Sequence, residues 1–378
     1  MIPYGRQHIS EQEIDATRLV LQSDWLTQGP KVAEFEAALA AYVQAPHGIT
    51  CANGTAALHA ACAALGLGPG DELWTSPNSF VASANCGMYL GAKVDFVDID
   101  PHTRNLCPKQ LAAKLAAGRV PKILVAVHFA GVACDMPAIF ALAQKYGFYV
   151  VEDAAHAIGT QVEGVPVGAC RYSHATCFSF HPVKNLTTGE GGAITTADAV
   201  IANRLRRFVT HGITKNPEEF TEPCPPPWYY EQQSLGFNYR LCDIQAAVGI
   251  VQLSKLESFI QKRTELFQRY QDHLADLPVT RPTQPKQQRV APHIYVVELP
   301  PDARLPVFNS LKAAGVGVNV HYIPIHLQPY YRALGFKAGD FPVAEQYYAG
   351  ALTLPLFVDM SVAQQDYVIE QLERALCA

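Results

Sequence analysis

Apolar positions in the first 45 residues recur with the spacing of amphipathic helices. The range Ser10–Gln22 is predicted to be helical, with Ser10 as N-cap and Glu13 three positions later, which is the pattern of a capping box. A second helix is predicted over residues 32–43, where Phe35 and Leu39 lie one helical turn apart. Between the two helices lies SDWLTQGP, which is expected to be a loop.

From residue 48 to residue 198, short apolar runs alternate with longer helical stretches. The predicted strands lie in ITC, ELWT, KVDFVDID, KILVAVHF, FYVVED, HATCFSF and GGAITT. The helical stretches between them include GTAALHAACAA and MPAIFALAQKYG. Strands that alternate with helices indicate an α/β domain with a mostly parallel central sheet.

The pattern changes in the C-terminal part of the chain. Residues 215–233 are rich in proline and aromatic residues and are expected to be loop, and a long amphipathic helix is predicted over 243–274. Strands are predicted in RVAPHIYVVELP and VNVHYIPIH, and helices over 304–317 and 362–376. We therefore expect a large domain over residues 1–250 and a smaller α+β domain over 251–378.

Composition narrows the class of protein. Hydrophobic residues make up 49% of the 378 residues, enough for a sizeable core, and a net charge of −5 argues against nucleic acid as a partner. The ten cysteines form no CxxC pair, which is typical of buried thiols in a reducing compartment. No apolar run has the length of a membrane helix, and the N-terminus shows no signal peptide. A cytoplasmic protein without membrane association is the expectation, and no metal site is expected.

Four features of the α/β part point to chemistry, and each has an alternative interpretation. Asn53-Gly54-Thr55 lies between a strand and a helix, where backbone amides can hold an anion, but it could be an ordinary turn. Asp153 ends a strand, where ligands bind in open α/β sheets, but it could cap a helix. Lys184 follows a strand, where a desolvated amine could form an imine with an aldehyde, but most lysines are simply solvated. Phe80 could stack on a flat ring or belong to the core.

Together the four features suit one cofactor. Pyridoxal phosphate (PLP) requires a lysine for its aldehyde, a carboxylate for its ring nitrogen, an anion cradle for its phosphate and a flat partner for its ring. Glycines in the tail TTGEGG, immediately after Lys184, allow the backbone to turn closely behind such a cofactor.

The chain also resembles a known family over nearly its whole length. The segments NGTAALHAA, GPGDELWTSPNSFVASAN, VVEDAAHAIG, SFHPVKNLTTGEGGAITT and LGFNYRLCDIQAAVGIVQL are similar to the DegT-type nucleotide-sugar aminotransferases, which have the aspartate-aminotransferase fold (fold type I). Within this family, IPYGRQHIS, DWLTQGP and PPPWYYEQQSLGFNYR look most like transaminases of pseudaminic acid biosynthesis. The resemblance implies transfer of an amino group from L-glutamate to C4 of a UDP-linked 4-keto-6-deoxy-N-acetylhexosamine.

The resemblance also implies roles for individual residues. Lys184 would hold the cofactor and act as general acid/base, and Asp153 would pair with the ring nitrogen. The other implied cofactor contacts are Gly54, Thr55, Phe80, His156, Ser179 and, toward the partner subunit of a homodimer with shared active sites, Asn238. The implied substrate contacts are Tyr4, Leu26, Thr27, Gln28, His181, His321 and Tyr322. Two positions depart mildly from the family pattern, ANGT in place of SGT and Cys242 in place of Ser or Thr.

Three other functions stay open on the sequence. The substrate could be another keto-sugar, linked to UDP or dTDP, or be aminated at C3. A dehydratase of the same fold that uses the pyridoxamine form of the cofactor is disfavoured, because members of that type have histidine in place of the lysine. A non-catalytic regulator that binds the cofactor is disfavoured, because all the residues that catalysis requires are present in the sequence.

Overall fold

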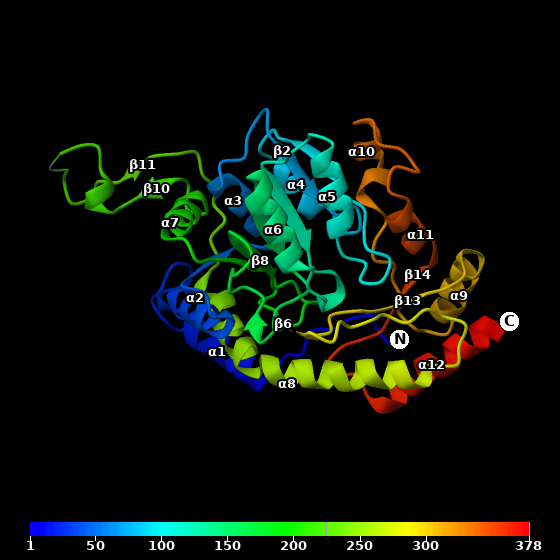
Figure 1. Cartoon of the computed structure of the whole chain (residues 1–378). Coiled ribbons are helices and arrows are strands. Elements are labelled where there is room, and N and C mark those ends of the chain that lie inside the picture. The colour runs from blue at the N-terminus through cyan, green and yellow to red at the C-terminus, as the bar shows by residue number, and fades with distance from the viewer. Residues whose placement is uncertain (224, 378) are drawn as a thin grey trace.

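The computed structural model describes residues 1–223 and 225–377 and is built around a seven-stranded sheet (Figure 1). In spatial order its strands are β1 (His47–Cys51), β9 (Gly192–Thr196), β8 (Ala175–Ser179), β5 (Tyr149–Asp153), β4 (Ile123–Val127), β2 (Glu72–Thr75) and β3 (Lys93–Phe96). The pairs from β8 to β3 are parallel, whereas β9 is antiparallel to both β1 and β8. The predicted mostly parallel sheet is therefore confirmed.

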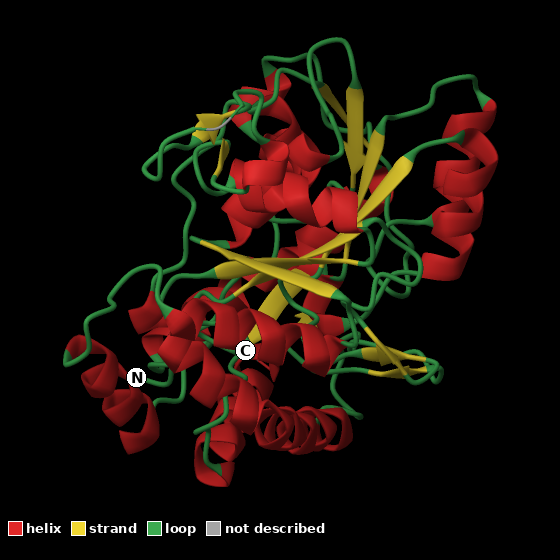
Figure 2. Ribbon diagram, turned by 90° about the vertical axis from the view of Figure 1, so that its left-hand side faces the viewer, coloured by secondary structure: helices red, strands yellow, loops and turns green. Residues whose placement is uncertain are grey.

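Helices cover both faces of this sheet (Figure 2). On one face Leu73 belongs to a core shared with α3 (Gly54–Ala64), α4 (Ala82–Met88) and α7 (Ala199–Phe208). The next residue, Trp74, belongs to the opposite core, which is shared with α5 (Pro108–Ala116) and α6 (Met136–Tyr146). Strands buried on both faces have no need of polar alternation, which explains the continuous apolar runs of the sequence.

The N-terminal helices lie against one long helix of the C-terminal half. Both α1 (Glu11–Leu21) and α2 (Pro30–Val43) pack on α8 (Asp243–His273). Ser10 caps α1 and forms the predicted capping box with Glu13. Lys255 of α8 reaches the Glu13 carboxylate at 2.9 Å, so the capping box also connects the two helices.

The smaller C-terminal part is α+β, as predicted. The antiparallel strands β13 (Tyr295–Glu298) and β14 (Ala351–Leu354) pack with α9 (Pro301–Ala313) and α12 (Val362–Cys377). Two more helices, α10 (Pro329–Arg332) and α11 (Pro342–Gly350), lie toward the large sheet. The chain's first residues join this part, because Ile2 forms a bridge with Val316.

Helix α8 runs along both parts of the molecule (Figure 1). Leu253 and Leu256 in its first half belong to a core beneath the large sheet, whereas Leu266 and Phe267 in its second half belong to the core of the smaller part. The division predicted between residues 250 and 251 falls inside this continuous helix.

Two local predictions need correction. The segment 318–326 was predicted to be a strand, but it forms only a bridge between Asn319 and Thr353 before the short 3₁₀ turn Ile325–Leu327. Pro324 has no N–H for a ladder, so this run cannot continue as a strand despite its β-branched residues. The predicted loop 215–233 contains one short strand, β11 (Glu231–Gln232), which pairs with β10 (Ile213–Thr214) in an arm that projects from the large domain. Cys224 lies outside the described residues.

Three short strands, β6 (Gln161–Val162), β7 (Val165–Pro166) and β12 (Gln288–Arg289), form a small separate sheet. Across the described ranges, no helix is long and apolar enough to cross a membrane.

Candidate active site

A cavity of about 590 Å³ opens at the carboxyl ends of β4, β5 and β8, where the smaller part of the chain meets the large sheet. In this position several strands and loops of an open α/β sheet can contribute to one site. Eleven of the predicted site residues line it: Tyr4, Gly54, Thr55, Phe80, Asp153, His156, Ser179, His181, Lys184, His321 and Tyr322. Segments far apart in the sequence thus meet around one space large enough for a cofactor.

Lys184 lies in the loop that follows β8, and its amine is buried near several imidazole side chains. Burial lowers the pKa of His156, His293 and His321, and the nearby lysine charge lowers each of them further. Desolvation lowers the pKa of Lys184 to about 8, while the charge of Asp153 opposes this shift. About a tenth of this amine is therefore neutral, and hence nucleophilic, at pH 7.

Asp153 is the last residue of β5 and its side chain is buried. Its Oδ2 accepts a hydrogen bond from Ser83 Oγ at 2.6 Å, and its Oδ1 accepts one from the Ala155 amide at 3.2 Å. Neither of these two donors carries a positive charge that would balance the charge of the carboxylate. Its position in the cavity suits a cationic ring nitrogen as the missing partner.

The turn at the start of α3 has the form of an anion cradle. Asn53 caps the helix through a hydrogen bond from the Ala56 amide to its Oδ1 at 2.8 Å, so the exchange of Ser for Asn leaves a functional cap. A Cβ on Gly54 would lie 2.8 Å from Cβ of Ser179, which shows how closely the backbone approaches the end of β8. The free amides at this helix end and the Ser179 hydroxyl fit a phosphate group.

Histidine and tyrosine side chains form the far wall of the cavity. Tyr322 Oη lies 3.1 Å from Nε2 of His156, and the ring of His293 lies 4.3 Å from that of His156, centroid to centroid. The Ala130 amide donates to Nδ1 of His156 at 3.3 Å, so the neutral ring carries its proton on Nε2. Burial is the main cause that lowers the pKa of His156 and keeps it neutral.

Phe80 and Tyr4 approach the cavity from opposite parts of the chain. The Phe80 ring is 59% exposed although it follows a buried segment, so one face is free to cover a flat ligand. Tyr4 belongs to the N-terminal segment, and its backbone carbonyl accepts a hydrogen bond from the Leu356 amide at 3.0 Å. Its ring lies 5.7 Å from that of His321, centroid to centroid.

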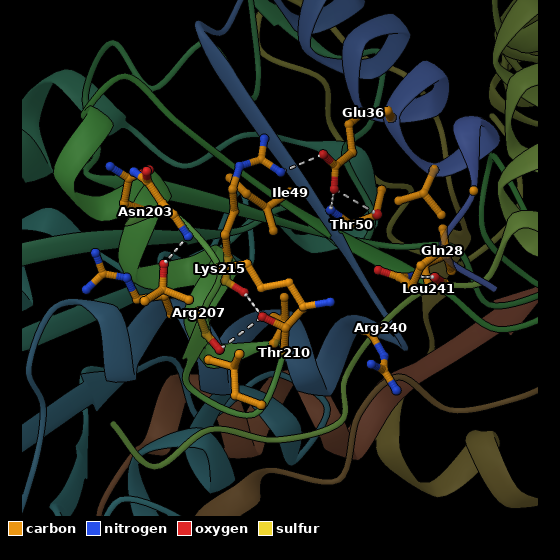
Figure 3. Close-up of a pocket in the computed structure, with 18 of the residues that line it drawn as sticks. Gln28, Glu36, Ile49, Thr50, Asn203, Arg207, Thr210, Lys215, Arg240 and Leu241 are labelled. Atoms are coloured by element: carbon orange, nitrogen blue, oxygen red, sulfur yellow. Dashed lines mark hydrogen bonds and ion pairs between the residues drawn. The ribbon is translucent and has the colours of Figure 1, made fainter. Parts of the chain in front are cut away.

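The remaining four predicted residues do not line this cavity in the described chain. Asn238 is exposed and forms a bridge with Thr210. Gln28 lies in a second cavity of about 560 Å³, beside Leu241 and Arg240 (Figure 3). Its Nε2 donates to the Leu241 carbonyl at 2.8 Å, and the Asp243 amide donates to the Thr27 carbonyl at 3.1 Å. The Leu26–Gln28 loop is therefore attached to the segment that carries Asn238.

Sequence reasoning missed several residues of the cavity. These are mainly Ser79, His128, Ala155, Glu190, His293 and Asn319. Ser79 and Ala155 are close neighbours of predicted residues, so their motifs offered a signal. Asn319 lies two residues before the predicted His321, whereas no pattern near His293 indicated a site.

The residues present fit PLP, because a desolvated amine, a buried carboxylate and an anion cradle converge on one space. Among residues 1–223 and 225–377, no group of three or more His, Cys, Asp or Glu side chains is arranged to hold a metal ion. The fold is that of the PLP-dependent sugar aminotransferases of fold type I.

The chain belongs to the DegT/DnrJ/EryC1/StrS aminotransferase family, whose model matches residues 7–373. It is 40% identical to the spore coat polysaccharide biosynthesis protein SpsC of Bacillus subtilis, over 98% of this chain and 95% of SpsC. Spr1654 of Streptococcus pneumoniae, assigned as a sugar aminotransferase and solved in PLP and PMP forms, is 30% identical in its PMP form, with a TM-score of 0.92 and 99% coverage of both chains. PseC of Helicobacter pylori, an aminotransferase of pseudaminic acid biosynthesis, is 27% identical, with a TM-score of 0.91 and 99% coverage of both chains.

Proposed function

We propose that this enzyme transfers the amino group of L-glutamate to C4 of a UDP-linked 4-keto-6-deoxy-N-acetylhexosamine, in the cytoplasm and in the biosynthesis of pseudaminic acid. The convergence of Lys184, Asp153 and the Gly54–Thr55 turn on one cavity is the observation that carries the amino-transfer chemistry. The likeness to PseC and the sequence motifs support the particular sugar.

In this proposal each residue has a defined task. When bound, PLP supplies an aldehyde and an electron-accepting ring that carry the amino group from donor to acceptor. Lys184, with its lowered pKa, takes up and returns protons at the reacting carbon. Asp153 keeps the ring nitrogen protonated, and Gly54, Thr55 and Ser179 hold the phosphate. Phe80 covers the ring, and His156 lies by the phenolic oxygen.

The substrate contacts in the proposal come from two places. Tyr4, His181, His321 and Tyr322 line the same cavity as Lys184, which supports their assignment as contacts of the sugar. Asn238 and the Leu26–Gln28 loop lie elsewhere, and we assign them to the active site of a partner subunit. Exposed apolar residues on neighbouring segments support a homodimer, since Leu235 is 79% exposed and Trp25 is 58% exposed.

The test is a mass-spectrometric assay with ¹⁵N-labelled L-glutamate and a panel of UDP- and dTDP-linked 4-keto and 3-keto sugars. The proposal expects label at C4 of the UDP-4-keto-6-deoxy-N-acetylhexosamine, with 2-oxoglutarate as the second product. Lys184→Ala should lower turnover by about a thousandfold or more, whereas the matched change Lys262→Ala, at a side chain of α8 that is 39% exposed, should leave it unchanged. Label on a dTDP sugar or at C3 instead would establish the alternative sugar aminotransferase.

A further inference from the structure

Three buried side chains form a chain of hydrogen bonds that ends on the carboxylate of Asp153. Ser79 Oγ lies 2.7 Å from Ser83 Oγ, and Ser83 Oγ lies 2.6 Å from Asp153 Oδ2. Ser79 is 3% exposed and Ser83 is fully buried. Ser79 precedes Phe80 in the loop at the cavity, and Ser83 belongs to the first turn of α4.

The direction of these hydrogen bonds follows from the chemistry of the groups. An ionised carboxylate can only accept, so the Ser83 hydroxyl must donate its proton to Asp153. Ser83 Oγ can then only accept from Ser79, whose hydroxyl is the donor of that second bond. The chain therefore points two aligned O–H dipoles toward the negative charge.

Apart from the Lys184 amine, whose positive charge attracts the Asp153 carboxylate, the rest of the surroundings offers Asp153 little stabilisation. The buried thiols of Cys86 and Cys177 lie near Asp153. The contact with Cys62 and burial raise the pKa of Cys86, and the Asp153 charge adds to this effect. Burial raises the pKa of Cys177, and the Asp153 charge again adds to the effect. Neutral thiols are weak donors. Within the described residues, the hydrogen bonds to the Asp153 side chain come from Ser83 and from the Ala155 amide.

We propose that Ser83, supported by Ser79, is a positioning residue that holds the Asp153 carboxylate oriented toward the ring nitrogen of the cofactor. This inference rests on the proposed role of Asp153. Without the Ser83 hydroxyl, Asp153 Oδ2 loses its side-chain donor, and the carboxylate no longer keeps its orientation toward the ring nitrogen. The ring nitrogen would then hold its proton less firmly, and the ring would accept electrons less readily.

The chain offers a matched control on the neighbouring residue of the same strand. Glu152 is a buried carboxylate that accepts from the Ser173 hydroxyl, and Ser173 is itself buried. Glu152 does not line the cavity in the described chain. Ser173→Ala thus removes the same kind of hydrogen bond from a buried carboxylate of β5, but on the face away from the cofactor.

The experiment is ¹⁵N NMR of the holoenzyme, reconstituted with PLP labelled at its ring nitrogen. The wild-type signal should be that of a protonated ring nitrogen, and Ser83→Ala should shift it toward the unprotonated value. Ser83→Thr, which keeps the hydroxyl, and Ser173→Ala should both keep the wild-type signal. The rate of the half-reaction with L-glutamate should fall about ten- to a hundredfold in Ser83→Ala and recover in Ser83→Thr.

The NMR outcomes distinguish the role of Ser83 from the proposed role of Asp153. An unprotonated ring nitrogen in the wild type would refute the proposed role of Asp153 itself. A protonated wild type with an unchanged signal in Ser83→Ala would refute only the role of Ser83. If Ser83→Ala does not fold, Ser79→Ala takes its place: a smaller shift in the same direction supports the inference, and a wild-type signal overturns it.

Discussion

The phenol oxygen of Tyr322 lies 3.1 Å from Nε2 of His156 and joins the two parts of the molecule at the cofactor cavity. His156 follows β5 of the large sheet, whereas Tyr322 belongs to the irregular segment that precedes α10. Since the Ala130 amide occupies Nδ1, Tyr322 is the acceptor for the remaining imidazole proton. The position of His156 therefore depends on the smaller part of the chain.

Tyr322→Phe removes that acceptor and leaves a buried N–H without a partner. We expect a loss of about 1 kcal/mol in the free energy of unfolding and a decrease of about tenfold in kcat/KM. Denaturant titration and steady-state kinetics would measure the two effects. Tyr330→Phe, on an exposed side chain in the same region, is the control and should change neither. Wild-type kinetics in Tyr322→Phe would show that His156 needs no orientation from this phenol.

A methyl group on Gly54 should weaken cofactor binding. The added Cβ would lie 2.8 Å from Cβ of Ser179 and would force the helix end and the strand end apart. We expect the Kd for PLP to rise by about tenfold or more in Gly54→Ala, because the phosphate cradle loses its geometry. Equilibrium titration of the apoenzyme, followed by protein fluorescence, gives this constant.

Gly68→Ala is the matched control, since a Cβ there meets no atom within 4 Å. Equal PLP affinity in the two alanine variants would contradict the assignment of the Gly54 turn to the phosphate.

The pH dependence of cofactor capture should report the lowered pKa of Lys184. Desolvation brings this pKa to about 8, and only the neutral amine attacks an aldehyde. The rate constant for capture of PLP by the apoenzyme should therefore rise about tenfold per pH unit below pH 8 and level off above it. Stopped-flow absorbance after mixing measures this rate. A rate that kept rising up to pH 10 would indicate an ordinary solvated lysine.

Hybrid dimers can test whether Asn238 acts in the partner's active site. Lys184→Ala and Asn238→Ala should each be severely impaired alone. In a hybrid of the two, one of the two sites would have both residues intact, so mixed and re-associated subunits should recover about a quarter of wild-type turnover. Activity measured before and after subunit exchange gives the comparison. If Asn238 served its own subunit's site, exchange would restore nothing.

Local sequence patterns determined the order of strands and helices in the large domain and the positions of the main site residues. The alternation of strands and helices, the glycine turn before α3, the acid at the end of β5 and the lysine after β8 are each encoded within a few consecutive residues. Parallel strands bring their carboxyl ends to one edge, so these local features were bound to converge. The wrong strand at 318–326 shows the limit of such reasoning, because that segment is shaped by Pro324 and by its position at the cavity.

The tertiary structure alone decided which distant side chains complete the site. Nothing near His293 in the sequence marks it as a residue of the cavity, and nothing near Ser83 indicates that its hydroxyl reaches Asp153. Only the tertiary structure shows that Gln28 lies outside the Lys184 cavity and is hydrogen-bonded to Leu241, near Asn238 in the chain. Periodicity reports the neighbours of a residue along its own element, whereas contacts between elements depend on how whole layers pack, and only the folded chain contains that information.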